Sequence, residues 1–215
     1  MIENGNRLSK LRKELRTEHL NSEERVSLLK ICEEYNDVFY FSGDKLTFTT
    51  AAEHAVPTPA VDPTRGTNSK PYRIPEVHRE EVRRQTDKML RDDILEPSTS
   101  PWNSQILVIP KKEDASGKRK WRIVVDFRKL NEVTVDDSFP LPVISEILDT
   151  LGSSKYFSTI DCASGFLQVP VKAEDQAKTA FSTREGHFQY KRMPIGLKGA
   201  PATFQRLMTT VLSGI

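Results

Sequence analysis

The chain has 215 residues, of which 37% are hydrophobic and 29% charged, and its formal net charge at pH 7 is +2. This composition is typical of a globular protein with a modest core, and the near-neutral charge gives no whole-chain argument for a polyanionic partner. The two cysteines, Cys32 and Cys162, have neither a zinc-ligand nor a disulfide-framework spacing. Because no run of about 18 apolar residues and no signal-peptide pattern is present, we expect an intracellular protein, cytoplasmic or nuclear, with no membrane partner.

The first third of the chain predicts a small helical unit followed by an extended segment. Within residues 1–41, leucines recur at helical spacing, and Ser22 is a candidate cap for a helix with acidic residues in its first turn. Residues 42–69 hold several prolines and glycines among Thr and Ala, which predicts an extended linker with one candidate strand over 46–50.

From residue 70 onward, helical and strand patterns are mixed. Helices are expected over about 75–94, 142–151 and 200–212, where apolar residues recur with helical spacing. Two β-hairpins are expected, 105–109 with 122–126 and 179–183 with 187–190, together with an apolar strand over 156–161. These elements predict an α+β fold.

Asp161 ends the apolar strand that we expect from Tyr156. A carboxylate at such a position is costly to bury unless a cation or hydrogen-bond donors meet it, so Asp161 is a candidate metal ligand for phosphoryl chemistry. The alternative is that Asp161 caps a turn. Phe166, five residues later, is a candidate floor beneath a bound sugar, with a place in the core as the alternative.

Basic residues are concentrated in the first expected hairpin. Between Pro110 and Asn131 there are eight basic and three acidic residues, a local net charge of +5. Lysine point charges and arginine forks of this kind hold phosphate groups, whereas a solvated turn is the alternative.

A loop rich in small residues precedes the last expected helix. Gly196, Lys198 and Gly199 lie in it. Exposed backbone amides at a helix start favour negative charge, and the lack of side chains would let a flat group such as a base approach closely. The alternative is an ordinary tight loop.

Taken together, the segments from residue 70 onward resemble the reverse transcriptase domain of gypsy-type LTR retrotransposon Pol polyproteins. The resemblance covers about two thirds of the chain, and its seven motifs occur in the order of that family. They are SPWNS (100–104), VIPKK (108–112), WRIVVDFRKLN (121–131), PLP (140–142), FSTID (157–161), KTAF (178–181) and MPIGLKGAPATFQ (193–205).

This resemblance implies an α+β, reverse-transcriptase-like fold. Residues 70–215 would form the fingers and a partial palm, an antiparallel sheet with packed helices, preceded by a helical N-terminal extension (1–41) and the extended linker (42–69). The implied activity is that of an RNA-directed DNA polymerase, which transfers nucleotides from a dNTP to the primer of an RNA or DNA template-primer with two Mg²⁺ ions. The oligomeric state is left open.

The resemblance also implies roles for individual residues. Asp161 would be the first catalytic aspartate and a ligand of both Mg²⁺ ions, with the backbone carbonyl of Cys162 facing a metal ion. Phe166 would be the steric gate against a ribose 2′-hydroxyl. The incoming triphosphate would contact Lys111, Lys112 and Arg122, and the nucleotide and template pocket would be lined by Ile195 and Gly196.

Asp161 by itself cannot hold both metal ions with good geometry, and the family supplies two more carboxylates in a later Tyr-x-Asp-Asp motif that these 215 residues lack. The pairs at 92–93 and 136–137 are expected to be solvated and not to replace it. We therefore expect little polymerase activity from this chain alone. The alternatives are a non-catalytic nucleic-acid-binding or interaction protein derived from a transposon remnant, and an unrelated domain in which Asp161 is structural.

Overall fold

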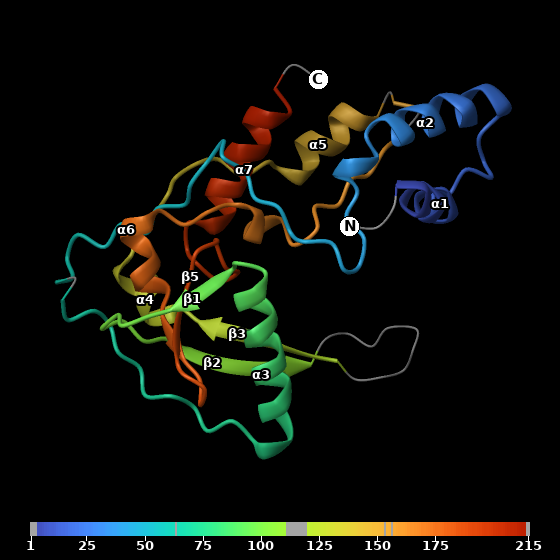
Figure 1. Ribbon diagram of the computed structural model, residues 1–215. Helices are drawn as coiled ribbons and strands as arrows, with labels where there is room; N and C mark the ends of the chain where they lie inside the picture. The colour runs from blue at the N-terminus through green and yellow to red at the C-terminus, as the bar shows by residue number, and fades with distance from the viewer. Residues whose placement is uncertain (1–3, 63, 111–119, 153, 156, 214–215) are drawn as a thin grey trace. The chain divides into compact units, whose positions relative to one another are not determined.

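The computed structural model describes residues 4–62, 64–110, 120–152, 154–155 and 157–213 (Figure 1). They form two compact units, Met1–Leu46 and Thr47–Ile215. Among the described residues, no helix is both long and apolar enough to span a membrane.

The first unit is a small helical unit built on α1 (Asn4–Glu14), α2 (Ser22–Glu34) and the 3₁₀ turn η1 (Asn36–Val38). Its core contains Leu11, Cys32 and Phe41. The helix cap differs from the sequence prediction by one residue: the side chain of Asn21, not Ser22, accepts a hydrogen bond from the Glu24 amide at 2.9 Å. The Glu24 carboxylate in turn accepts from the Asn21 amide at 3.0 Å, which completes a capping box.

The predicted basic hairpin is confirmed in the second unit. Strands β2 (Gln105–Pro110) and β3 (Trp121–Asp126) pair antiparallel, with Arg122 opposite Ile109. The helix α3 (Glu76–Arg91) packs along β3 (Figure 1). The short helix α4 (Arg128–Val133) follows β3 in the chain.

The second predicted hairpin is also present, but it belongs to a three-stranded antiparallel sheet. The order is β1-β5-β4, from β1 (Leu95–Pro97), β5 (His187–Tyr190) and β4 (Phe181–Ser182). The rings of Phe181 and Tyr190 lie 5.5 Å apart and are buried. The short edge strand β1 was not predicted, because three residues that end in a proline give too little periodicity.

The remaining elements of this unit are helical. They are α5 (Ile144–Leu151), η2 (Gly165–Gln168), α6 (Ala173–Gln176), η3 (Ala177–Thr179) and α7 (Ala200–Val211).

The prediction of an apolar strand over 156–161 is wrong for the residues that the structure describes. Residues 157–161 have no strand assignment, and the side chains of Phe157 and Ile160 are 65% and 90% exposed. A strand needs a hydrogen-bonded neighbour, and none of the described segments pairs with this one.

The segment from residue 47 to 61 contains no helix, and the candidate strand over 46–50 is not formed. It is also packed: Thr49 donates to the Gln168 carbonyl at 2.7 Å, and His54 forms a bridge with Val171. The side chains of His54 and Val56 are almost fully buried. The division of the chain into an extension, a linker and a polymerase domain remains a prediction.

His54 joins this extended segment to α7. Its side chain is 2% exposed, and its Nδ1 lies 2.9 Å from the hydroxyl of Thr203. Burial disfavours the imidazolium and lowers the pKa of His54 to about 4, although the carboxylates of Asp175 and Asp137 act in the opposite direction.

We predict that stability falls on acidification because of His54. The unfolded chain takes up a proton near pH 6.5, whereas the folded chain does so only near the pKa of about 4. The contribution is therefore complete above pH 6.5 and is lost as pH falls, by about 2 kcal/mol at pH 5. Urea unfolding at pH 7 and pH 5 measures it. The matched control is His54→Gln, which cannot titrate at this position. Between pH 7 and pH 5 its free energy of unfolding should fall by about 2 kcal/mol less than that of the unchanged chain. Equal losses in the two proteins would contradict the prediction.

Candidate functional site

The loop between β5 and α7 is anchored by a buried guanidinium. Arg192 is 3% exposed and donates to the backbone carbonyls of Asp93 at 3.1 Å, Asp92 at 3.3 Å and Thr47 at 3.3 Å. Its charged end lies 5.1 Å from the centre of the Phe48 ring. Burial lowers the pKa of Arg192, and the nearby carboxylates of Asp93 and Asp92 partly offset this. This arginine fixes where the loop begins.

A second anchor holds the middle of the loop. The side-chain amide of Asn131, in α4, donates to the Gly196 carbonyl at 2.8 Å and accepts from the Lys198 amide at 2.9 Å. Gly196 has φ +102°, a conformation that L side chains rarely adopt. Ile195 is left 61% exposed. Two hydrogen bonds from one side chain therefore set the shape of the segment that sequence analysis assigned to the nucleotide and template pocket.

The aspartates at 136–137 are exposed, as expected, and each also forms an ion pair. Asp136 pairs with Lys198 at 2.8 Å, and Asp137 with Arg206 of α7 at 2.8 Å. The Arg206 guanidinium holds the pKa of Asp137 below its usual range. These two ion pairs hold the segment after α4 against the loop and α7.

In the basic hairpin, Arg122 lies in β3 and is exposed. Lys111 and Lys112 lie outside the described residues. Arg128 does not add a free charge, because its guanidinium forks onto Asp126 with a closest contact of 2.6 Å. That hydrogen bond lowers the pKa of Asp126. Of the three predicted phosphate contacts, Arg122 is therefore the one that lies within the described residues.

Asp161 and Cys162 are exposed, and neither belongs to a strand or helix. Among the described residues, no three or more His, Cys, Asp or Glu side chains come together as a metal site. Asp161 alone does not make the two-ion site that the resemblance implies.

Phe166 packs on α7. Its ring contacts that of Phe204 edge-on, at 5.2 Å between centroids, and is half-buried. A Cβ on Gly165 would lie 2.9 Å from the Phe204 ring, so the backbone at this point must approach α7 closely. The steric-gate role of Phe166 stays a prediction.

The structure thus brings the loop of Gly196 close to the strand that carries Arg122. A Cβ on Gly196 would lie 3.7 Å from the Val125 carbonyl, which places the loop beside the strand that carries Arg122. Two further residues, Asn131 and Arg192, shape this region and were not singled out. Asn131 lies inside one matched motif and Arg192 directly before another, but nothing in the sequence shows that their side chains reach the loop backbone.

The fold is that of known reverse transcriptases. A foamy viral protease-reverse transcriptase in complex with an RNA/DNA hybrid matches with a TM-score of 0.81 and 25% identity, over 100% of this chain and 27% of that chain. The same enzyme in complex with dsDNA matches with a TM-score of 0.74 and 24% identity, over 100% of this chain and 41% of that one.

Sequence comparison gives the same family. The profile described as "Reverse transcriptase (RNA-dependent DNA polymerase)" matches residues 109–215. The Pol polyprotein of transposon 297 from Drosophila melanogaster is 45% identical, over 93% of this chain and 18% of its own length. That of transposon 412 from the same species is 41% identical, over 89% of this chain and 15% of its own length. The enzymatic polyprotein of Figwort mosaic virus is 37% identical, over 72% of this chain and 23% of its own length.

We predict that Asn131→Ala frees the loop. Removal of two hydrogen bonds should lower the free energy of unfolding by about 1–3 kcal/mol and accelerate hydrogen exchange at the Lys198 amide. Amide exchange measured by NMR tests this. Glu132→Ala changes an exposed neighbour on α4 and is the control, which should leave that exchange rate unchanged. An unchanged exchange rate in Asn131→Ala would show that the two hydrogen bonds of Asn131 do not hold the loop.

The matched motifs, the profile and the solved structures agree with one another, and the α+β architecture is the one that the resemblance implied. The chain spans less than a quarter of each of these three polyproteins. It belongs to the reverse transcriptase family and is similar to the reverse transcriptase region of retrotransposon Pol polyproteins.

Proposed function

We propose that this chain forms the fingers and part of the palm of an RNA-directed DNA polymerase that extends a primer on an RNA or DNA template. The observation that carries the proposal is the match of the whole chain to a foamy viral protease-reverse transcriptase in complex with an RNA/DNA hybrid. The high identity to transposon Pol polyproteins supports it further.

In this proposal, the hairpin β2–β3 and the loop of Ile195 and Gly196 contact the incoming nucleotide and the template. Arg122 supplies a forked cation for the triphosphate, together with Lys111 and Lys112. Ile195 is exposed for contact, and the backbone of Gly196 lets a base approach without a side chain in between. Phe166, fixed against Phe204, excludes a ribose 2′-hydroxyl.

The polymerase family generally uses divalent metal ions, and we propose Mg²⁺ here, with Asp161 and the Cys162 carbonyl as ligands. When bound, such ions activate the primer 3′-hydroxyl and stabilise the leaving pyrophosphate. The described residues bring no group of three or more His, Cys, Asp or Glu side chains together, so they do not form the two-ion site by themselves. An intracellular location, in the cytoplasm or the nucleus, is part of the proposal, and the exposed free thiol of Cys162 is in keeping with a reducing compartment.

Arg122→Ala should weaken dNTP or template-primer binding by about 1–3 kcal/mol, because the variant lacks the guanidinium that would donate to the phosphate. Fluorescence anisotropy with a labelled RNA/DNA hybrid, and with a labelled dNTP, measures this. Arg91→Ala, at the exposed end of α3, is the control and should bind as the unchanged chain does. Equal affinity of Arg122→Ala and the control would remove the phosphate contact from the proposal.

Asp161→Asn should abolish the strengthening of dNTP binding by Mg²⁺ and leave binding in EDTA unchanged, because only the carboxylate ligand is removed. Titration of dNTP with and without Mg²⁺ shows this, with Asp149→Asn as an exposed control. Mg²⁺-dependent dNTP binding that survives in Asp161→Asn would contradict the assignment of Asp161 as a metal ligand.

We also expect these 215 residues to bind the RNA/DNA hybrid but to show no robust incorporation of dNTP in a primer-extension assay. Robust incorporation would contradict the prediction that these residues alone have little polymerase activity.

A further inference from the structure

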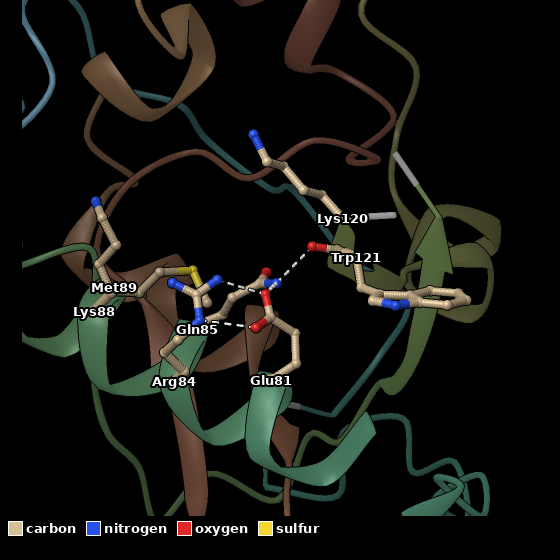
Figure 2. Close-up of a pocket in the computed structure, with 7 residues that line it drawn as sticks. All are labelled: Glu81, Arg84, Gln85, Lys88, Met89, Lys120 and Trp121. Atoms are coloured by element: carbon tan, nitrogen blue, oxygen red, sulfur yellow. Dashed lines mark hydrogen bonds and ion pairs between the residues drawn. The ribbon is translucent and has the colours of Figure 1, made fainter. Parts of the chain in front are cut away.

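A hollow of about 480 Å³ lies between α3 and the start of β3, and no predicted site residue lines it (Figure 2). Its volume falls in the range of ligand sites. Its lining contains three cations and one carboxylate, together with a glutamine, a methionine and a tryptophan: Glu81, Arg84, Gln85, Lys88, Met89, Lys120 and Trp121. The balance of charge favours an anion.

The hollow opens on the face of the hairpin opposite to Arg122. Trp121 and Arg122 are successive residues of β3, so their side chains point to opposite faces. The Trp121 ring packs on that of His78 in α3, with centroids 4.2 Å apart, which identifies the face of α3. The hollow is therefore separate from the face that presents Arg122 to the nucleotide.

One wall of the hollow is held rigidly by Gln85. Its side-chain amide donates to the Trp121 carbonyl at 2.8 Å (Figure 2). The same amide accepts from the Ile123 backbone amide at 3.1 Å. It pairs with the edge of β3 as a neighbouring strand would. These two bonds hold the backbone of β3 at a fixed distance from α3.

The cation at its centre is oriented in advance. Glu81 accepts from Arg84 Nε at 2.8 Å and from Arg84 Nη2 at 2.5 Å, and this pairing raises the pKa of Arg84 (Figure 2). In the part of the chain that the structure describes, no hydrogen bond occupies Arg84 Nη1. The guanidinium therefore keeps its charge and a donor edge for a further oxygen acceptor.

Lysines complete the cationic lining. Lys88 lies one turn along α3 from Arg84, with its ammonium 2.7 Å from Asp92, and Lys120 directly precedes β3 (Figure 2). Three cations from α3 and the residue before β3 line one hollow, and several cations along a groove are what proteins use to follow a phosphodiester backbone.

We propose that this hollow binds the phosphate backbone of single-stranded nucleic acid on the outer face of the fingers, as a second contact besides the nucleotide site. The inference rests on the proposed function, because it assumes that a nucleic acid is bound by this chain. Arg84, Lys88 and Lys120 hold the phosphates, and the apolar Met89 lies beside them.

Anisotropy of a labelled single-stranded oligonucleotide, titrated over a range of salt concentrations, tests the site in the full chain. Arg84→Gln and Lys88→Gln should each weaken binding about 2- to 5-fold, the range of an exposed ion pair. The double variant should lower the slope of log affinity against log salt by about 1.4, or about 0.7 for each phosphate that is no longer neutralised. Arg83→Gln and Arg91→Gln, on the same helix but outside the hollow, are matched controls. A double variant that behaves like the controls overturns the proposal.

Glu81→Gln gives a test that misfolding cannot imitate. It removes the one carboxylate of the lining and keeps an oxygen that can accept from Arg84, so oligonucleotide binding should strengthen about 2- to 5-fold. Unchanged or weaker binding would count against an anion site. Excess inorganic pyrophosphate should not displace the oligonucleotide; displacement would assign the hollow to a small phosphate ligand and overturn the strand assignment.

The two proposals fail in different ways. If the unchanged chain binds neither hybrid nor single strand, the proposed function fails. If it binds both, and the Arg84 and Lys88 variants match their controls while Arg122→Ala does not, only the outer site fails.

Discussion

The buried guanidinium of Arg192 is the interaction on which the second unit depends. It leaves water to bind carbonyls of Asp92, Asp93 and Thr47, which lie after α3 and at the start of the extended segment. Desolvation of this cation is costly, and three acceptors with an aromatic face offset that cost only while all of them stay in place. The loop that follows is then shaped by the two hydrogen bonds of Asn131 and by the ion pair of Lys198 with Asp136.

The loop of Ile195 and Gly196 and the hollow between α3 and β3 follow one physical rule: a side-chain amide bonds to exposed backbone in place of a neighbouring strand or helix. Asn131 does this for Gly196 and Lys198, and Gln85 does it for Trp121 and Ile123. In both cases the amide satisfies a donor and an acceptor without adding charge. Rigid backbone beside a positive charge is the arrangement that anion binding needs.

Hairpins and helices with strong local periodicity were predictable from the sequence. The pairs β2–β3 and β4–β5 and the helices α3, α5 and α7 lie where alternation and helical spacing placed them. The strand expected before Asp161 failed for a non-local reason, because the same alternation forms a strand only where another segment pairs with it. Likewise β1 exists because β5 offers it a partner, and not because of its own residues.

The family, the basic hairpin and the identity of the candidate residues follow from the sequence alone, because motif order and local charge are properties of the chain. Which of these residues meet depends on the tertiary fold. It placed Gly196 beside the strand of Arg122, fixed Phe166 against Phe204, and left Asp161 exposed and outside any cluster of three or more metal-binding side chains among the described residues. It also formed the hollow between α3 and β3, where Gln85 meets Trp121 from 36 positions away in the chain. Such contacts depend on burial and on long-range hydrogen bonds, which no local pattern encodes.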